Sequence, residues 1–93
     1  FKQLNRCSVI ALGINKYLCD AWQVSGGILY DLKLEFGFLS DNSIVLAGVV
    51  DCDNWRVQWN NILLSKQGYR EGGDLEQIIS VYRLAASLTD KFV

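Results

Sequence analysis

Residues 28–39 contain the pattern that most restricts the fold, because apolar and polar side chains alternate there almost without interruption. Every second residue from Ile28 to Phe38 is apolar, and three charged side chains stand between them. Successive side chains of a strand point to opposite faces of a sheet, so this pattern predicts one half-buried strand.

Helical patterns stand on both sides of this region. Across residues 3–23, apolar residues recur in steps of three and four, which predicts a helix that ends at the Ser-Gly-Gly sequence beginning at Ser25. Asp74 is a natural N-cap for a second helix that reaches about residue 90. Apolar side chains also lie off the main stripe of the first helix, so we expect this helix to pack on more than one side.

Further strands are predicted between the helices. Residues 44–52 are apolar on both faces, which is typical of a central strand. Residues 55–59 alternate around two tryptophans, and residues 62–65 suit a short fourth strand. A helix over residues 55–65 stays open, because the large apolar residues of this segment also share a helical face. Residues 66–73 are polar and glycine-rich, which predicts a loop.

The order of these elements predicts an α+β fold for residues 1–93, which we treat as a single domain. An N-terminal helix, a three- to four-stranded antiparallel sheet and a C-terminal helix follow each other as α-β-β-β(-β)-α, in two layers. Of the 93 residues, 51% are hydrophobic and 20% are charged, which is the balance of a folded domain. The chain begins with Phe1 rather than methionine, so we expect that residues preceded it in the natural product.

Composition and charge exclude several classes of protein. The net charge is −1 and the basic residues are scattered, whereas nucleic-acid binding needs a concentrated basic surface. The longest apolar run, residues 44–50, is too short to span a membrane. The three cysteines, Cys7, Cys19 and Cys52, have no metal-site or disulfide spacing, so we expect free thiols and a reducing, cytoplasmic location.

The chain contains no histidine, which removes the most common general base and the usual zinc ligand. Triads that need histidine are therefore excluded. We predict that the chain is not an enzyme and binds no cofactor. The main hypothesis is a protein-interaction module that docks another protein or, as a homodimer, a second copy of itself.

Exposed aromatic residues mark the predicted interface, because tryptophan and tyrosine dominate binding hot spots. Trp55, Trp59 and Tyr69 are the candidates in the second half of the chain. Ile10 and Tyr17 are the candidates on the first helix, whose apolar surface is wider than one packing face needs.

The alternative hypothesis is a domain that binds a small ligand or a divalent metal and is possibly an enzyme. Asp51 and Asp53 follow an apolar strand, and two carboxylates at a strand end can hold Mg²⁺ or supply a nucleophile. Tyr69 or Arg70 would assist them. The same aspartates also suit an ordinary polar turn.

Overall fold

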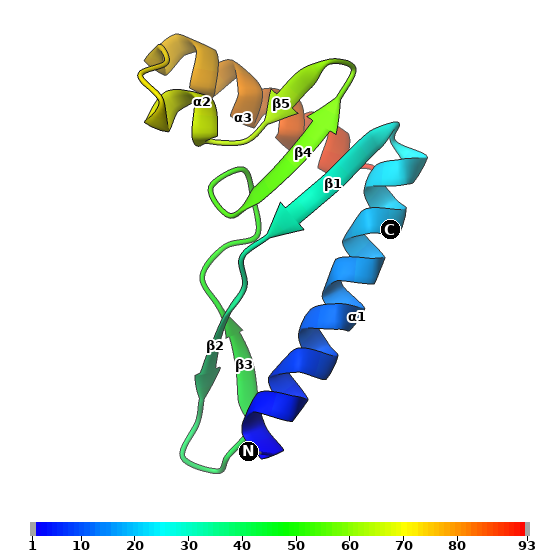
Figure 1. Ribbon diagram of the computed structural model, residues 1–93, viewed down its shortest axis with the longest axis vertical. Helices are drawn as coiled ribbons and strands as arrows, with labels where there is room; N and C mark the ends of the chain where they lie inside the picture. Colours follow the sequence, from blue (N-terminus) through cyan, green and yellow to red (C-terminus); the bar gives the residue numbers. More distant parts are fainter. Residues whose placement is uncertain (1, 93) are drawn as a thin grey trace.

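The computed structural model describes residues 2–92 and confirms the predicted α+β class (Figure 1). The helices are α1 (Lys2–Val24), α2 (Gln67–Arg70) and α3 (Leu75–Thr89). The strands are β1 (Gly27–Leu32), β2 (Glu35–Phe38), β3 (Ile44–Ala47), β4 (Trp55–Trp59) and β5 (Ile62–Leu64). A long N-terminal helix, antiparallel strands and a C-terminal helix therefore follow each other as the sequence predicts.

The strands form two antiparallel sheets rather than one. β1, β4 and β5 make a three-stranded sheet in the order β1-β4-β5, while β2 and β3 pair only with each other. In Figure 1 this β2–β3 hairpin points away from the larger sheet and lies beside the N-terminal half of α1. The single strand predicted over residues 28–39 is wrong in extent, because the chain leaves one sheet at Leu32 and enters the other at Glu35. Side-chain alternation does not record which strand the backbone pairs with.

The strand predicted over residues 44–52 is also shorter than expected. β3 ends at Ala47, and Val45 and Leu46 are 39% and 44% exposed, so this strand is not central. Residues 55–65 form β4 and β5, as the strand interpretation predicted. Asn60 and Asn61 join them with φ of 50° and 64°. Asparagine tolerates this conformation, which a tight hairpin turn requires at both central positions.

One face of the three-stranded sheet forms the core with α1 and α3, which gives the two predicted layers. Trp22 of α1 is fully buried there. Its ring meets Trp55 edge to face with centroids 5.5 Å apart, and meets Phe92 in the same way at 5.1 Å. Gly27 allows this packing, because a β carbon there would lie 2.8 Å from the Trp22 ring. The buried apolar residues are Leu18, Trp22, Leu29, Cys52, Trp55, Val57, Leu64, Ala85 and Leu88.

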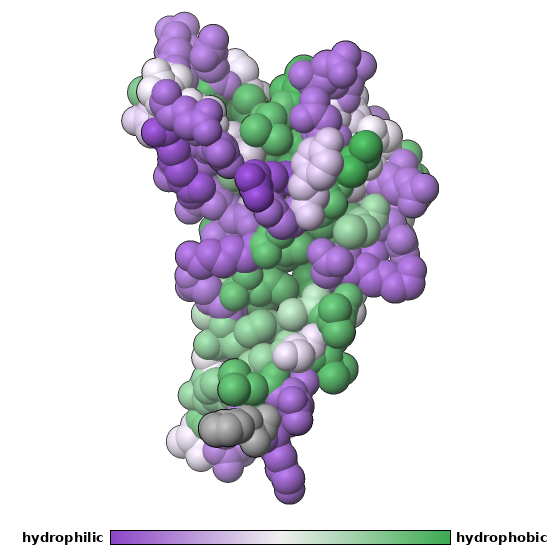
Figure 2. All heavy atoms as spheres, in the orientation of Figure 1, coloured by the Kyte–Doolittle hydropathy of each residue, from purple (hydrophilic) through white to green (hydrophobic). Residues whose placement is uncertain are grey.

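Much of α1 lies outside this core. Within α1, Leu18 and Trp22 are buried, whereas Val9, Leu12 and Val24 are 70%, 70% and 90% exposed. Figure 2 shows apolar side chains gathered across the middle and lower part of one face, over α1 and the hairpin. Within residues 2–92, no helix is long and apolar enough to cross a membrane.

Candidate functional site

Charged side chains converge where the chain passes between the two sheets. We call this group the charged cluster: Asp31, Lys33, Glu35, Asp53, Arg56, Lys66 and Arg70. They come from three segments, namely residues 31–35, which run from β1 into β2, residues 53–56, which run from the β3–β4 connection into β4, and residues 66–70, which contain α2. All but Lys66 line two adjoining hollows of about 390 and 220 Å³, which share Lys33, Asp53 and Asn54.

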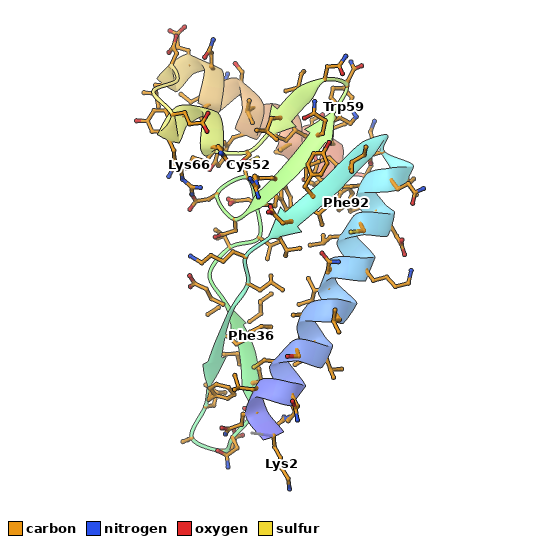
Figure 3. The ribbon with its side chains drawn as sticks, viewed as in Figure 1. Lys2, Phe36, Cys52, Trp59, Lys66 and Phe92 are labelled. Atoms are coloured by element: carbon orange, nitrogen blue, oxygen red, sulfur yellow. The ribbon has the colours of Figure 1, made fainter. Side chains whose placement is uncertain are left out.

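Asp53 lies between two cations of the α2 segment. Its Oδ1 is 2.8 Å from Nη2 of Arg70 and 3.4 Å from Nζ of Lys66. Arg70 also donates to the backbone oxygen of Asp53 at 3.0 Å. The backbone N–H of Lys66 donates to the carbonyl of Cys52 at 2.8 Å, which fixes the start of α2 against the β3–β4 connection. Figure 3 shows Cys52 and Lys66 close together, where the start of α2 lies beside this connection.

Arg56 and Asp31 form a two-point ion pair across the ladder of β1 and β4, where they are register partners. Arg56 Nε donates to Asp31 Oδ1 at 2.9 Å, and a terminal guanidinium nitrogen donates to the other oxygen. This pairing lowers the pKa of Asp31 and raises the pKa of Arg56. Lys33 reaches Glu35 at 3.1 Å. The cluster therefore offers cationic groups that are already oriented by carboxylates.

The Arg56→Gln variant is expected to raise the pKa of Asp31 toward its ordinary value, because the guanidinium hydrogen bonds are lost. The pKa of Asp31 is lower in the folded than in the unfolded chain, so the pair stabilises the fold above the unfolded-state pKa. That contribution disappears as pH falls through the folded-state pKa. Carbon-detected NMR titration of Asp31 measures the change. An unchanged titration midpoint would show that the pair does not persist in solution.

Asp51 mainly supports its own turn. Its carboxylate accepts the backbone N–H of Asp53 at 2.9 Å, and its carbonyl accepts the N–H of Asn54 at 2.9 Å. Within residues 2–92, no group of three or more His, Cys, Asp or Glu side chains is placed to hold a metal ion. Metal binding by Asp51 and Asp53 stays a prediction. Burial raises the pKa of the intervening Cys52 to about 11, so its thiol is neutral near pH 7 and is not activated as a nucleophile.

The aromatic residues predicted as an interface do not form one exposed patch. Trp55 is 5% exposed and belongs to the core. Trp59 is half-buried and its indole N–H donates to the carbonyl of Ser25 at 2.9 Å. Tyr69 lies on α2 and is 42% exposed, while Ile10 and Tyr17 lie on α1 and are 38% and 49% exposed.

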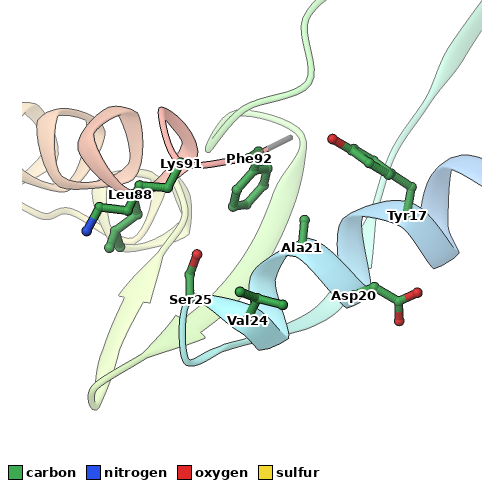
Figure 4. A pocket seen from close by; sticks show the side chains of 8 residues that line it. All are labelled: Tyr17, Asp20, Ala21, Val24, Ser25, Leu88, Lys91 and Phe92. Carbon is green, nitrogen blue, oxygen red and sulfur yellow. The ribbon is translucent and has the colours of Figure 1, made fainter.

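A separate hollow of about 460 Å³ lies between the C-terminal ends of α1 and α3 (Figure 4). Its apolar lining residues include Ala21, Val24, Leu88 and Phe92, and Asp20 is already paired with Lys16 at 2.9 Å. This hollow lacks the converging charges of the cluster, so it is not the candidate site.

A sequence profile of the SAICAR synthetase family matches residues 1–85 of the chain. This chain belongs to the SAICAR synthetase family. The phosphoribosylaminoimidazole-succinocarboxamide synthase of Roseiflexus castenholzii is 35% identical over 82 residues, which cover 80% of this chain and 33% of that protein. The Caldivirga maquilingensis protein of the same name is 33% identical over 81 residues, covering 87% and 34%.

Solved structures of SAICAR synthetases have the same fold. The Ehrlichia chaffeensis phosphoribosylaminoimidazole-succinocarboxamide synthase matches with a TM-score of 0.84 and 30% identity, covering 96% of this chain and 39% of that one. A SAICAR synthetase in complex with ADP matches with a TM-score of 0.81 and 30% identity, covering 100% and 40%. The chain therefore spans about a third of these curated relatives and two fifths of the solved ones.

Family membership overturns the predicted non-enzymatic interaction module, because SAICAR synthetases are enzymes. The prediction that the chain is not an enzyme was wrong because it relied on the missing histidine. The alternative hypothesis of a small-ligand or enzymatic domain agrees better with the comparisons. Lys33, Glu35 and Arg56 were not singled out, since each was interpreted as part of the polar face of a strand. The available signal was the position of Arg56, which is close in sequence to Asp53.

Proposed function

We propose that the charged cluster forms part of the active site of an ATP-dependent ligase of the SAICAR synthetase type. The observation that supports this most is that four cationic and three carboxylate side chains converge where the chain passes between the two sheets. A solved relative with a TM-score of 0.81 holds ADP, which fits a nucleotide as one of the bound molecules.

The names of the relatives describe a product in which a phosphoribosylaminoimidazole carries a succinocarboxamide. An amide forms from a carboxylate only after one carboxylate oxygen becomes a good leaving group. Phosphoryl transfer from ATP achieves this: the carboxylate oxygen bonds to the terminal phosphorus, and ADP departs. The amine then attacks the carbonyl carbon, inorganic phosphate leaves, and the amine loses a proton.

Every anionic group in such a reaction needs positive charge nearby, and the cluster supplies it. Lys33, Arg56 and Arg70 would bind phosphate and carboxylate oxygens and stabilise the charge that builds up during phosphoryl transfer. Glu35 and Asp53 line the same hollow. Mg²⁺ is usually held by one or two carboxylates together with nucleotide phosphates, so these two side chains fit a nucleotide-borne ion. That ion would neutralise phosphate charge.

The chain is expected to bind ADP in the presence of Mg²⁺, and Lys33→Gln is expected to weaken the affinity about tenfold. The physical reason is the loss of one positive charge from the wall shared by both hollows. Isothermal titration calorimetry measures both affinities. Lys16→Gln, which removes an exposed charge on α1, serves as the control. A wild-type chain that gives no heat with millimolar ADP and Mg²⁺ would refute the proposed nucleotide site.

We also infer that α1 makes the contact with a second copy of the chain, with Ile10 and Tyr17 among its contact residues. The exposed apolar surface of α1 supports this, since such surface on a helix marks an interface. Trp59 and Tyr69 stay proposed as contacts elsewhere. A cytoplasmic location and a single domain over residues 1–93 also remain part of the proposal.

The Ile10→Glu variant is expected to shift a dimer toward monomer, because a buried unpaired carboxylate opposes apolar packing. Light scattering after size-exclusion chromatography at micromolar concentration measures the mass. Asn5→Glu makes the same charge change at an exposed position of the same helix. A wild-type chain that is monomeric at all concentrations contradicts the inferred contact.

A further inference from the structure

We propose that Asn54 is a positioning residue that fixes the distance between the two halves of the charged cluster. The inference rests on the proposed function of that cluster. One half, Lys33 and Glu35, lies where the chain enters the hairpin. The other half, including Asp53 and Arg56, lies beside and on β4. Asn54 stands between them and lines both hollows.

Three hydrogen bonds place Asn54 at the crossing of the two chain segments. Its backbone carbonyl accepts the N–H of Lys33 at 2.7 Å, on the segment that leaves the three-stranded sheet. Its side-chain amide donates to the carbonyl of Val49 at 2.6 Å, on the segment that returns from the hairpin. Its backbone N–H donates to the carbonyl of Asp51 at 2.9 Å. One residue therefore binds both segments that join the two sheets.

This crossing determines where the hairpin lies relative to the larger sheet, because no strand of the hairpin pairs with that sheet. The covalent links are residues 33–34 and 48–54, which contain no strand or helix. At the far tip, Arg6 of α1 reaches the carbonyl of Asn42 at 3.4 Å, a long hydrogen bond on the surface. A shift at the crossing therefore changes where Lys33 and Glu35 stand relative to Asp53. Catalytic and binding groups tolerate displacements of only about 0.5 Å.

The side-chain bond to Val49 is the part of this arrangement that a substitution can remove. Leucine is close to asparagine in size and carries neither a donor nor a charge. Asn54→Leu therefore removes the link to the Val49 carbonyl without adding charge to the cluster. Asn54→Ser replaces the amide with a shorter side chain whose hydroxyl does not extend as far toward Val49, and it provides a second variant if Asn54→Leu does not fold. Asn5→Leu on the exposed side of α1 is the control.

Hydrogen–deuterium exchange and ADP titration with Mg²⁺ test the role of Asn54. We expect amide exchange to rise about fivefold to tenfold in Asn54→Leu at Lys33 and Asp53, whose N–H groups donate to Asn54 and Asp51. Exchange at Val57, which is fully buried in the core, is expected to stay unchanged, and ADP affinity is expected to fall by a similar factor. A rise in exchange at these amides without a rise at Val57 would distinguish positioning from a general loss of stability.

Two results would overturn this role. Unchanged exchange at Lys33 would show that the Val49 bond does not hold the crossing. A uniform rise that includes Val57 would show that Asn54 acts on overall stability alone. If the wild-type chain does not bind ADP, the proposed function fails while the exchange data still decide whether Asn54 holds the crossing.

Discussion

Replacing Trp22 with alanine is expected to cost about 3–5 kcal/mol of folding free energy, which is most of the stability of a small domain. Trp22 is fully buried and contacts both Trp55 and Phe92 edge to face, so its removal leaves a cavity between α1 and the sheet. Urea unfolding followed by far-ultraviolet circular dichroism measures the loss.

Trp22→Phe provides a graded comparison. The Trp22 indole nitrogen is buried and has no hydrogen-bond partner in the part of the chain that the structure describes, so phenylalanine removes an unpaired donor as well as some packing. Its cost is therefore expected to lie well below that of alanine. Val9→Ala, at a 70% exposed position of the same helix, is expected to change stability by less than about 0.5 kcal/mol. A loss below about 1 kcal/mol in Trp22→Ala would mean that α1 does not pack against the sheet as described.

Reversing the charge of Arg70 is expected to give the largest functional loss, about a hundredfold in affinity for ADP with Mg²⁺. The Arg70→Glu variant removes a cation 2.8 Å from Asp53 and adds a carboxylate beside it. Two charge units about 6 Å from a bound phosphate, at an effective dielectric constant of about 40, change the binding free energy by roughly 3 kcal/mol. Calorimetric titration at fixed salt concentration gives the ratio of affinities.

Arg83→Glu is the matched control for this variant. It makes the same change in net charge on the exposed face of α3, outside the cluster. Screening at physiological salt reduces interactions between exposed charges separated by more than about 8 Å. The control is therefore expected to bind ADP within about threefold of wild type. Equal losses in both variants would mean that overall charge, rather than Arg70, determines binding.

The elements that the sequence predicted well are those set by local patterns. The first helix was expected over residues 3–23 and is found at Lys2–Val24, and Asp74 caps α3 by accepting the N–H of Glu76. Partner choice between strands was not predictable in this way. Residues 28–39 alternate in sequence, but the register of β1 against β4 shifts between Leu29 and Asp31, and the strand partner then changes at β2. Leu29 is buried, whereas Ile28 and Tyr30 are 57% and 61% exposed, so the alternation does not identify the buried face of β1.

Most of the candidate site was missed for a related reason. Its contacts join residues far apart in sequence: Arg70 and Asp53 are 17 positions apart, and Arg56 and Asp31 are 25. No spacing rule for a single element brings such pairs together. Asp53 and Arg70 were therefore considered only in the alternative hypothesis, and the other charges were interpreted as parts of solvated faces. The absence of histidine then argued against catalysis. Phosphoryl transfer depends mainly on positioning and on positive charge, which lysine and arginine provide.

The crossed indoles of Trp22 and Trp55 also give the chain an optical reporter. One chromophore belongs to α1 and the other to β4, and their planes meet at 89°. Excited states of two indoles at such short range couple, so the pair should produce an exciton band in circular dichroism that is distinct from the helix signal. The intensity of that band will report whether α1 is packed on the sheet. The helix signal will report separately whether α1 is helical.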